Sequence, residues 1–346
     1  MDINLFTSDR WGNLKMSLNP HKTLWLSWYP HRRTSGICQA WEVPLEIIES
    51  SRRSPISWLS KSCKTIKTLH RKRPDVLFVQ NPSLGLTILA VLLRSYFRYL
   101  LVVDAHNEGV RPFVRSGLFV QFLTRWLLRA ADTNVVTNDS LANEVSAMGG
   151  RVLILPDPLP TPNFTQQIDV SPRKKKVDVA VICTYAADEP ILDILAAAKL
   201  MPEKIFACTG RVEKFESLGL QAPENVEFTG FLTDQKYWDL LASASVICDL
   251  TLMPDCLVCG AYEALSVGRP MVLSSNKATE ELFGSVAILT ESEPSSIANA
   301  LQNAFKNEAE ISRAAIKEAH VYQNTWQSNA QKCLQEIEAQ KQRHER

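Results

Sequence analysis

The stretch VICDLTLMPDCLVCGAYEALSVGRPMVL, residues 246–273, contains a strand, a loop, a helix and a second strand in close succession. Residues 246–250 form a short apolar run of the kind that builds a buried strand. A loop follows, and then a pattern over 259–267 predicts a helix, which ends at a Gly-x-Pro turn before a second apolar run at 270–273. A strand, a crossover helix and a strand in this order predict two parallel neighbours in one sheet.

The same alternation of short apolar runs and longer helical patterns extends over most of the chain, which is typical of doubly wound α/β domains. Residues 156–176 interrupt it with five prolines and a basic run, as an interdomain linker does. We therefore expect an N-terminal domain at 1–160, a linker at 161–176, a C-terminal domain at 177–320 and a final helix at 321–346. Strands are expected at 23–28, 75–80, 99–104, 133–136, 152–155, 177–183, 204–208, 225–228, 246–250, 270–273 and 286–289, and helices at 58–71, 84–96, 118–131, 141–148, 190–200, 235–244, 259–267 and from 294 onward.

Length and composition are those of a folded protein with about two domains. The chain has 346 residues, of which 45% are apolar and 22% charged, and this excludes disordered and fibrous proteins. Residues 1–150 carry 19 basic and 11 acidic side chains, a net charge of +8, whereas the remaining residues carry 19 and 26, a net charge of −7. A basic N-terminal half indicates contact with anions or with an anionic surface.

The sequence also bears on the compartment. Eight cysteines are scattered along the chain, several of them inside apolar runs, which indicates buried thiols in a reducing compartment. The first fifteen residues show no secretory signal, and the longest uncharged apolar run, 82–93, is shorter than the roughly 20 residues of a spanning helix. We expect a cytoplasmic protein, with contact to the cytoplasmic face of a membrane as an open alternative.

Several common catalytic motifs are absent from the sequence. It contains no G-x-G-x-x-G, G-x-x-x-x-G-K-[ST], H-E-x-x-H or G-x-S-x-G. Nicotinamide, P-loop, zincin and serine-hydrolase chemistry therefore lose their sequence support. Cys256 and Cys259 have a metal-like spacing, but no second pair and no histidine accompany them, so we interpret them as ordinary thiols of a packed loop.

Two acidic residues of the opening stretch stand eight positions apart. Asp255 lies in the loop after the strand, and Glu263 lies about one turn into the helix, so both can face one ligand. Free backbone N–H groups over 257–261 suit oxyanions, and a carboxylate at this corner can accept hydrogen bonds from vicinal hydroxyls, as acidic residues do with ribose in other nucleotide folds. The alternative is that Asp255 caps the helix and Glu263 lies on a solvated face.

The stretch fits a known pattern, in which an acidic residue is followed after seven residues by Glu-Ala and then by Gly-x-Pro. The matching residues here are Asp255, Glu263, Ala264, Gly268 and Pro270. This pattern resembles the GT-B glycosyltransferases. The resemblance implies two Rossmann-like doubly wound domains facing across a cleft, with the C-terminal helix crossing back onto the N-terminal domain. It also implies that the glutamate holds the ribose of a nucleotide-sugar donor, while the acid and the amides after it hold the sugar.

The donor site departs from the family pattern in two places. The usual Glu-Gly-Phe-Gly-x-Pro is replaced by DCLVCG at 255–260, which leaves the donor sugar open, and the usual arginine–lysine clamp is replaced by CTYAADEP at 183–190. Arg211 and Lys214 can substitute by neutralising phosphate, and Phe231 stands where the family packs the base; surface cations and a core ring are the alternatives. The expected donor-binding residues are Thr184, Gly210, Arg211, Lys214, Phe231, Asp255, Leu257, Val258, Gly260 and Glu263.

Polar groups follow two strands of the N-terminal half, in FVQNP at 78–82 and in DAHNEG at 104–109. Both segments resemble the β-mannosyltransferases that extend chitobiosyl-diphosphodolichol, a group that also lacks the arginine–lysine clamp. His106 is the expected catalytic group, which orients or deprotonates an acceptor hydroxyl, and Glu108 is the alternative base. The stereochemistry of the transfer stays open.

The basic residues of the N-terminal half have two expected roles. Arg32 and Arg33 follow the first strand on a loop that faces the acceptor in this fold, where guanidinium groups suit a phosphate or diphosphate, unless the loop is merely solvated. Further cations interleave with aromatic residues, which allows this domain to lie on an anionic leaflet. The expected acceptor-binding residues are Arg32, Arg33 and Asn107. The further cations are Lys61, Lys64, Lys67, Arg71, Lys72, Arg73, Arg111, Arg115, Arg125 and Arg129, and the aromatic residues are Trp58, Phe119, Phe122 and Trp126.

The sequence thus predicts an enzyme that transfers a hexose from a UDP- or GDP-sugar to a hydroxyl of a glycan or lipid-diphosphate acceptor in cell-surface polysaccharide synthesis. We expect no cofactor besides the nucleotide sugar, no metal, because no Asp-x-Asp pair is present, and no nucleic-acid partner, because no recognition motif accompanies the charge. Two alternatives stay open: a catalytically silent GT-B subunit that binds a partner or a glycan, and a nucleotide-sugar epimerase of similar architecture.

Overall fold

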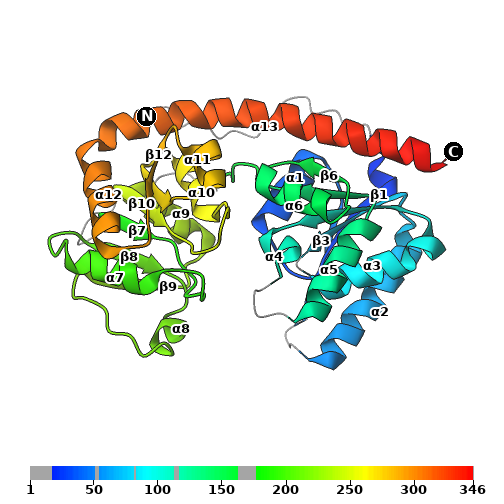
Figure 1. Cartoon of the computed structure of the whole chain (residues 1–346), viewed down its shortest axis with the longest axis horizontal. Coiled ribbons are helices and arrows are strands. Elements are labelled where there is room, and N and C mark those ends of the chain that lie inside the picture. The colour runs from blue at the N-terminus through cyan, green and yellow to red at the C-terminus, as the bar shows by residue number, and fades with distance from the viewer. Residues whose placement is uncertain (1–17, 51–53, 82, 113–116, 163–176, 346) are drawn as a thin grey trace. The chain divides into compact units, whose positions relative to one another are not determined.

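The computed structural model describes residues 18–50, 54–81, 83–112, 117–162 and 177–345. These residues cluster into two compact domains (Figure 1). The N-terminal domain contains 18–158 and 324–345, and the C-terminal domain contains 159–162 and 177–323. Most of the expected linker, with its basic run, lies outside the described residues.

The N-terminal domain is built on a parallel sheet whose order over the described residues is β2-β1-β3-β4-β5-β6. The central strands are buried at every position, while the edge strands β2 and β6 are partly exposed. A strand buried on both faces needs helices on both sides of the sheet, which is why its sequence is a continuous apolar run. The strands are β1 (Thr23–Ser27), β2 (Leu45–Ile47), β3 (Val76–Asn81), β4 (Leu100–Ala105), β5 (Thr133–Val136) and β6 (Val152–Ile154).

Helices connect these strands and cover the sheet (Figure 1). Helix α3 packs against both α2 and α5, and α4 contacts α6. Within the sheet core, the Trp25 ring stacks on Phe78 with ring centroids 4.9 Å apart. The helices are α1 (Arg32–Ala40), α2 (Pro55–Lys72), α3 (Leu84–Phe97), α4 (Asn107–Val110), α5 (Leu118–Ala130) and α6 (Asp139–Ala147), preceded by a 3₁₀ turn at Pro20–Lys22.

The C-terminal domain repeats this plan with a second parallel sheet, whose order over the described residues is β12-β11-β10-β7-β8-β9. Helix α7 packs against α12, and α9 packs against α10. The strands are β7 (Val179–Val181), β8 (Phe206–Thr209), β9 (Val226–Gly230), β10 (Val246–Asp249), β11 (Met271–Ser274) and β12 (Ala287–Thr290), and the helices are α7 (Ile191–Lys199), α8 (Val212–Glu216), α9 (Asp234–Ser243), α10 (Cys259–Val267), α11 (Lys277–Phe283), α12 (Pro294–Lys306) and α13 (Glu308–Glu345).

The long helix α13 contributes to both domains, because its residues group with the C-terminal domain up to Gln323 and with the N-terminal domain from Asn324. The Trp326 indole donates a hydrogen bond to the carbonyl of Pro156 over 2.8 Å. Further along, Gln340 accepts a hydrogen bond of 2.6 Å from the Thr133 hydroxyl. These contacts tie the end of the chain to strand β5 and to the loop after β6.

The predicted α/β fold with two parallel sheets is confirmed, and α10 has the predicted bounds. Five elements were not predicted because they are short or polar, namely β2, α1, α4, α8 and α11. The predicted loop at Arg32 and Arg33 is wrong, because both residues begin helix α1. The buried face of α1 includes Arg33 and Thr34 besides Ile37 and Cys38, so its apolar pattern was incomplete. No helix among the described residues is long and apolar enough to cross a membrane.

Candidate functional site

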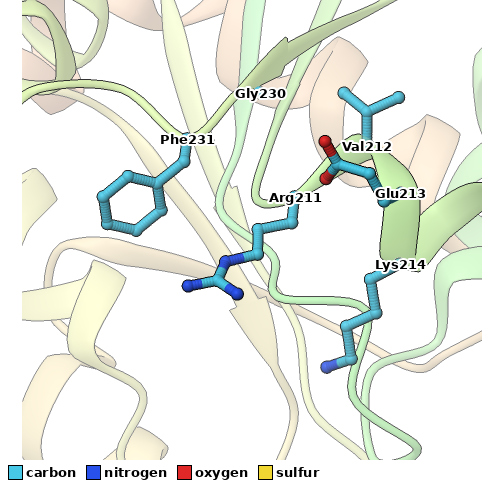
Figure 2. Close-up of a pocket in the computed structure, with 6 residues that line it drawn as sticks. All are labelled: Arg211, Val212, Glu213, Lys214, Gly230 and Phe231. Atoms are coloured by element: carbon cyan, nitrogen blue, oxygen red, sulfur yellow. The ribbon is translucent and has the colours of Figure 1, made fainter. Parts of the chain in front are cut away.

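A hollow of about 630 Å³ opens in the C-terminal domain where β8 and β9 end. Arg211 and Lys214, in the segment after β8, line this hollow. Phe231, the residue directly after β9, lines it as well. Figure 2 shows the Arg211 side chain reaching toward the Phe231 ring, and the guanidinium carbon lies 6.0 Å from the ring centroid. Strand carboxyl ends are where open α/β sheets bind ligands.

The Phe231 ring is 83% exposed, which excludes the alternative that it is a core ring. An exposed aromatic ring offers a flat apolar face on which a nucleobase can stack. The cations next to it offer charge to an oxyanion. Stacking and charge neutralisation are therefore available in one hollow.

The loop after β7 meets the same segment. The Lys214 ammonium donates a hydrogen bond of 2.6 Å to the Thr184 carbonyl, and the Glu189 carboxylate accepts hydrogen bonds from the Thr184 N–H and hydroxyl. Gly210 has φ +96°, and an added Cβ would lie 2.6 Å from the Cys183 carbonyl oxygen. Only glycine fits this close approach, so Gly210 lets the two loops lie side by side.

Helix α10 begins against a buried carboxyl group. Asp249, the last residue of β10, accepts a hydrogen bond of 2.8 Å from the Gly260 N–H. Burial raises the pKa of Asp249 well above its ordinary value, with added repulsion from Glu263. Glu263 is itself only 3% exposed and accepts a hydrogen bond of 2.5 Å from the Tyr237 hydroxyl, so the alternative of a solvated helix face is excluded.

The loop before α10 differs from the sequence-based expectation. Val258 is the N-cap of α10, so Asp255 does not cap the helix; it is half-buried and has a left-handed φ of +49°. The predicted set of free N–H groups over 257–261 is too large, because Gly260 donates to Asp249 and Ala261 donates to the Val258 carbonyl. The predicted residues Leu257 and Val258 are half-buried in this loop.

In the N-terminal domain, Arg33 is not exposed as predicted. Its Nε donates to Asp104 Oδ1 over 2.9 Å, and its Nη1 donates to Asp157 and to the Leu155 carbonyl, each over 2.8 Å. Both carboxylates raise the pKa of Arg33 against the effect of burial. Arg33 thus joins the start of α1 to the ends of β4 and β6 instead of facing an acceptor, whereas Arg32 is exposed.

His106 lies between the end of β4 and the start of α4. Its Nε2 is 3.0 Å from Asp104 Oδ2, and its ring lies edge-on to His31 with centroids 4.5 Å apart. Burial would raise the pKa of Asp104, but Arg33 and His106 hold it below its ordinary value. Burial and the neighbouring His106 lower the pKa of His31 to about 4. These groups place an ionised carboxylate against one imidazole and a neutral imidazole beside it.

The other predicted residues of this segment lie in the first turn of α4. Glu108 is exposed, and Asn107 is half-buried with its Oδ1 unpaired among the described residues. Four residues of these two regions were not predicted as site residues: Asp104, His31, Tyr237 and Asp249. Of these, the Asp104-x-His106 spacing at a strand end was a readable signal, because alternate residues of a strand end point the same way.

Residues 26–157 match the family model described as glycosyl transferase 4-like domain. This match lies within the N-terminal domain. Those residues extend from the end of β1 to the loop after β6 and include Arg33, Asp104 and His106. No curated protein sequence matches the chain.

Solved structures share the fold over most of the chain. Sucrose-phosphate synthase from Thermosynechococcus elongatus is 14% identical with a TM-score of 0.63, covering 84% of this chain and 76% of its own. HepE from Anabaena, solved with UDP and glucose, is 16% identical with a TM-score of 0.62, covering 93% and 97%. UDP-GlcNAc 2-epimerase from Methanocaldococcus jannaschii is 13% identical with a TM-score of 0.56, covering 82% and 92%.

At these identities the structures show a common fold. The predicted resemblance to the GT-B glycosyltransferases is confirmed by the family model over residues 26–157 and by the shared fold. The family match and the shared fold support the prediction of a glycosyltransferase-type enzyme. The epimerase shares the fold as well, so the fold does not distinguish sugar transfer from epimerisation.

Proposed function

We propose that this GT-B protein transfers a hexose from a UDP- or GDP-sugar to a hydroxyl of a glycan or lipid-linked saccharide. The observation that carries the proposal is the exposed Phe231 ring beside Arg211 in a hollow at the ends of β8 and β9. A nucleoside diphosphate presents both a flat base and two phosphates, and this hollow offers a partner to each.

The donor is held by the C-terminal domain in this proposal. The base stacks on Phe231, Arg211 and Lys214 neutralise the diphosphate, and Glu263, oriented by Tyr237, accepts hydrogen bonds from the ribose. Asp255 and the loop at 255–260 contact the sugar. The related fold of HepE, which was solved with UDP and glucose, supports a UDP-sugar as the first donor to try.

The acceptor is bound by the N-terminal domain in this proposal, with His106 as the general base and Glu108 as the weaker candidate. The exposed Arg32 supplies a cation for a lipid diphosphate. We propose that the reaction belongs to cell-surface polysaccharide synthesis on the cytoplasmic face of a membrane. We assign no metal ion and no further cofactor to the reaction.

Turnover tests the proposal. The full chain is incubated with UDP-glucose, UDP-galactose, UDP-GlcNAc and GDP-mannose, with and without a short-chain lipid-diphosphate saccharide, and nucleotide release is measured. We expect one donor to release nucleotide in an acceptor-dependent reaction. Binding without release would favour a silent GT-B subunit, and conversion of the sugar without any acceptor would favour an epimerase. Either result contradicts the transferase proposal.

Helix α5 supports the proposed membrane contact. Leu118, Phe119 and Phe122 are 83%, 74% and 69% exposed, and Arg125 and Arg129 are exposed on the same helix. Exposed apolar side chains near cations fit the interface of an anionic bilayer. Several of the predicted cations have other partners. Lys61 is buried against Trp28 and Tyr29, Arg111 pairs with Glu144, and Arg71 and Lys72 pair with Glu46. The predicted Arg115 lies outside the described residues.

We predict that Phe119→Asp combined with Phe122→Asp weakens binding to vesicles containing phosphatidylserine by at least about tenfold, because two apolar contacts are lost. Vesicle co-sedimentation measures the effect. Leu192→Asp is the matched control, since Leu192 is 61% exposed on α7 of the C-terminal domain. Equal loss in the control, or equal binding to neutral vesicles, would contradict an anionic membrane contact through α5.

A further inference from the structure

Asp104 is held in place by two contacts that use both of its oxygens. Oδ1 accepts a hydrogen bond from Arg33 Nε, and Oδ2 lies 3.0 Å from His106 Nε2. Asp104 is 1% exposed, and Arg33 is anchored in turn by Asp157 and the Leu155 carbonyl. The carboxylate therefore has one orientation, which is fixed from α1 and from the loop after β6.

This arrangement determines which nitrogen of His106 carries the proton. The ionised Asp104 can only accept a hydrogen bond, so Nε2 of His106 is the N–H donor. Nδ1 then carries the lone pair in the neutral imidazole. The His106 side chain is 16% exposed, and among the described residues Nδ1 has no hydrogen-bond partner. The His106 backbone is also fixed, because its N–H donates to the Asn81 carbonyl over 3.0 Å.

We propose that Asp104 and Arg33 are positioning residues that hold His106 as a base with Nδ1 free, and that the enzyme therefore inverts the anomeric configuration. This inference rests on the proposed transferase function. A direct displacement needs a base that removes the acceptor proton as the acceptor oxygen attacks, and a fixed carboxylate–imidazole pair supplies one. The neutral His31 packs edge-on against the ring and adds no competing charge.

The proposed step is balanced within the substrates and His106. The acceptor hydroxyl proton passes to Nδ1 of His106 while the acceptor oxygen bonds to the anomeric carbon. The bond from that carbon to the diphosphate oxygen breaks, and its electron pair leaves on the nucleoside diphosphate. The imidazolium that forms is stabilised by Asp104, and attack opposite the leaving group inverts the configuration.

The tautomer of His106 can be tested without any substrate. The full chain is labelled with ¹⁵N-histidine, and His106 is assigned by comparison with His106→Gln. We expect the Nε2-protonated tautomer in the wild-type protein and its loss in Asp104→Asn. An Nδ1-protonated His106, or a spectrum that Asp104→Asn leaves unchanged, would contradict the positioning role.

Kinetics and stereochemistry complete the test with the donor and acceptor that turn over in the panel described above. Asp104→Asn should lower kcat by at least about 10²-fold with the donor KM nearly unchanged. Asp132→Asn is the matched control, because it breaks the Arg94–Asp132 pair of the same domain at the amino end of β5, and it should keep kcat.

The configuration of the wild-type product, read by NMR of the anomeric proton, decides the case even if Asp104→Asn does not fold. An α-linked donor should give a β-linked product. A retained configuration, or normal kcat in a folded Asp104→Asn, would overturn the inference. Absence of any turnover would instead refute the transferase proposal, while the tautomer measurement would still report on Asp104 and His106.

Discussion

Asp249 shows how one buried group fixes the geometry of the donor corner at the residue scale. Its carboxyl group accepts a hydrogen bond from the Gly260 N–H, and an added Cβ at Gly260 would collide with Oδ2 of Asp249. The start of α10 is therefore set by a carboxyl group at the end of β10. The two contacting residues are eleven positions apart in the chain, and no rule of sequence spacing predicts their contact.

We predict that Asp249→Asn raises the free energy of unfolding at pH 7.5 by on the order of 1–3 kcal/mol, because the amide keeps an acceptor for Gly260 without a buried charge. The folded-state pKa of Asp249 is raised, so the carboxyl group costs stability as pH rises above its unfolded pKa of about 3.9. The gain should therefore be smaller at pH 5. Urea unfolding at both pH values measures this gain. An equal loss of free energy of unfolding at both pH values would contradict the explanation.

His31 has the opposite dependence on pH. Its pKa is about 4 in the folded protein, against about 6.5 when unfolded. Between these values the unfolded chain binds a proton that the folded protein does not, so stability falls as pH decreases. We predict that His31 contributes a loss of up to about 3 kcal/mol between pH 6.5 and pH 4. The free energy of unfolding of His31→Gln should fall less steeply over this pH range. A pH slope equal to that of the wild-type protein would exclude His31 as the cause.

At the scale of elements, the end of helix α10 explains the glycine of the Gly-x-Pro turn. Gly268 is the C-cap with φ +64°, and an added Cβ would lie 2.6 Å from Ile316 Cγ1 of α13. Both the left-handed backbone and the helix packing therefore require glycine there. Pro270 follows two residues later, just before β11.

We predict that Gly268→Ala lowers the free energy of unfolding by about 2–4 kcal/mol, the sum of left-handed strain and overpacking. Gly219→Ala is the control, because Gly219 has φ +68° but nothing within 4 Å of an added Cβ. That variant should lose only the strain, about 1–2 kcal/mol. Equal losses in chemical denaturation would show that Ile316 does not restrict the site.

Whether an element could be predicted from the sequence depends on whether its signals are local. The bounds of α10 were predictable because a buried strand, a helical pattern and a Gly-x-Pro turn agree locally. Helix α1 was missed because its buried face includes Arg33, whose burial depends on Asp104, 71 residues away. Local patterns therefore predicted the sheets and helix α10. Contacts between distant residues, such as Tyr237 with Glu263, required the structure.

At the scale of the whole molecule, each domain carries the residues for one part of the proposed reaction. The C-terminal domain holds a hollow with exposed cations and an aromatic ring, and the N-terminal domain holds a fixed Arg33–Asp104–His106 series. The proposal assigns the nucleotide to the first and the acceptor proton to the second. The nucleotide site is the part on which the rest depends, since no transfer occurs without a bound donor.

Calorimetric titration of UDP and GDP into the full chain tests this claim most directly. We predict that one nucleotide binds and that Phe231→Ala weakens it by about 1–3 kcal/mol, the contribution of one stacked base. Phe119→Ala, which removes another exposed ring, should leave the affinity unchanged. If Phe231→Ala binds the nucleotide as tightly as wild type, or if neither nucleotide binds at all, the hollow between Arg211 and Phe231 is not the donor site.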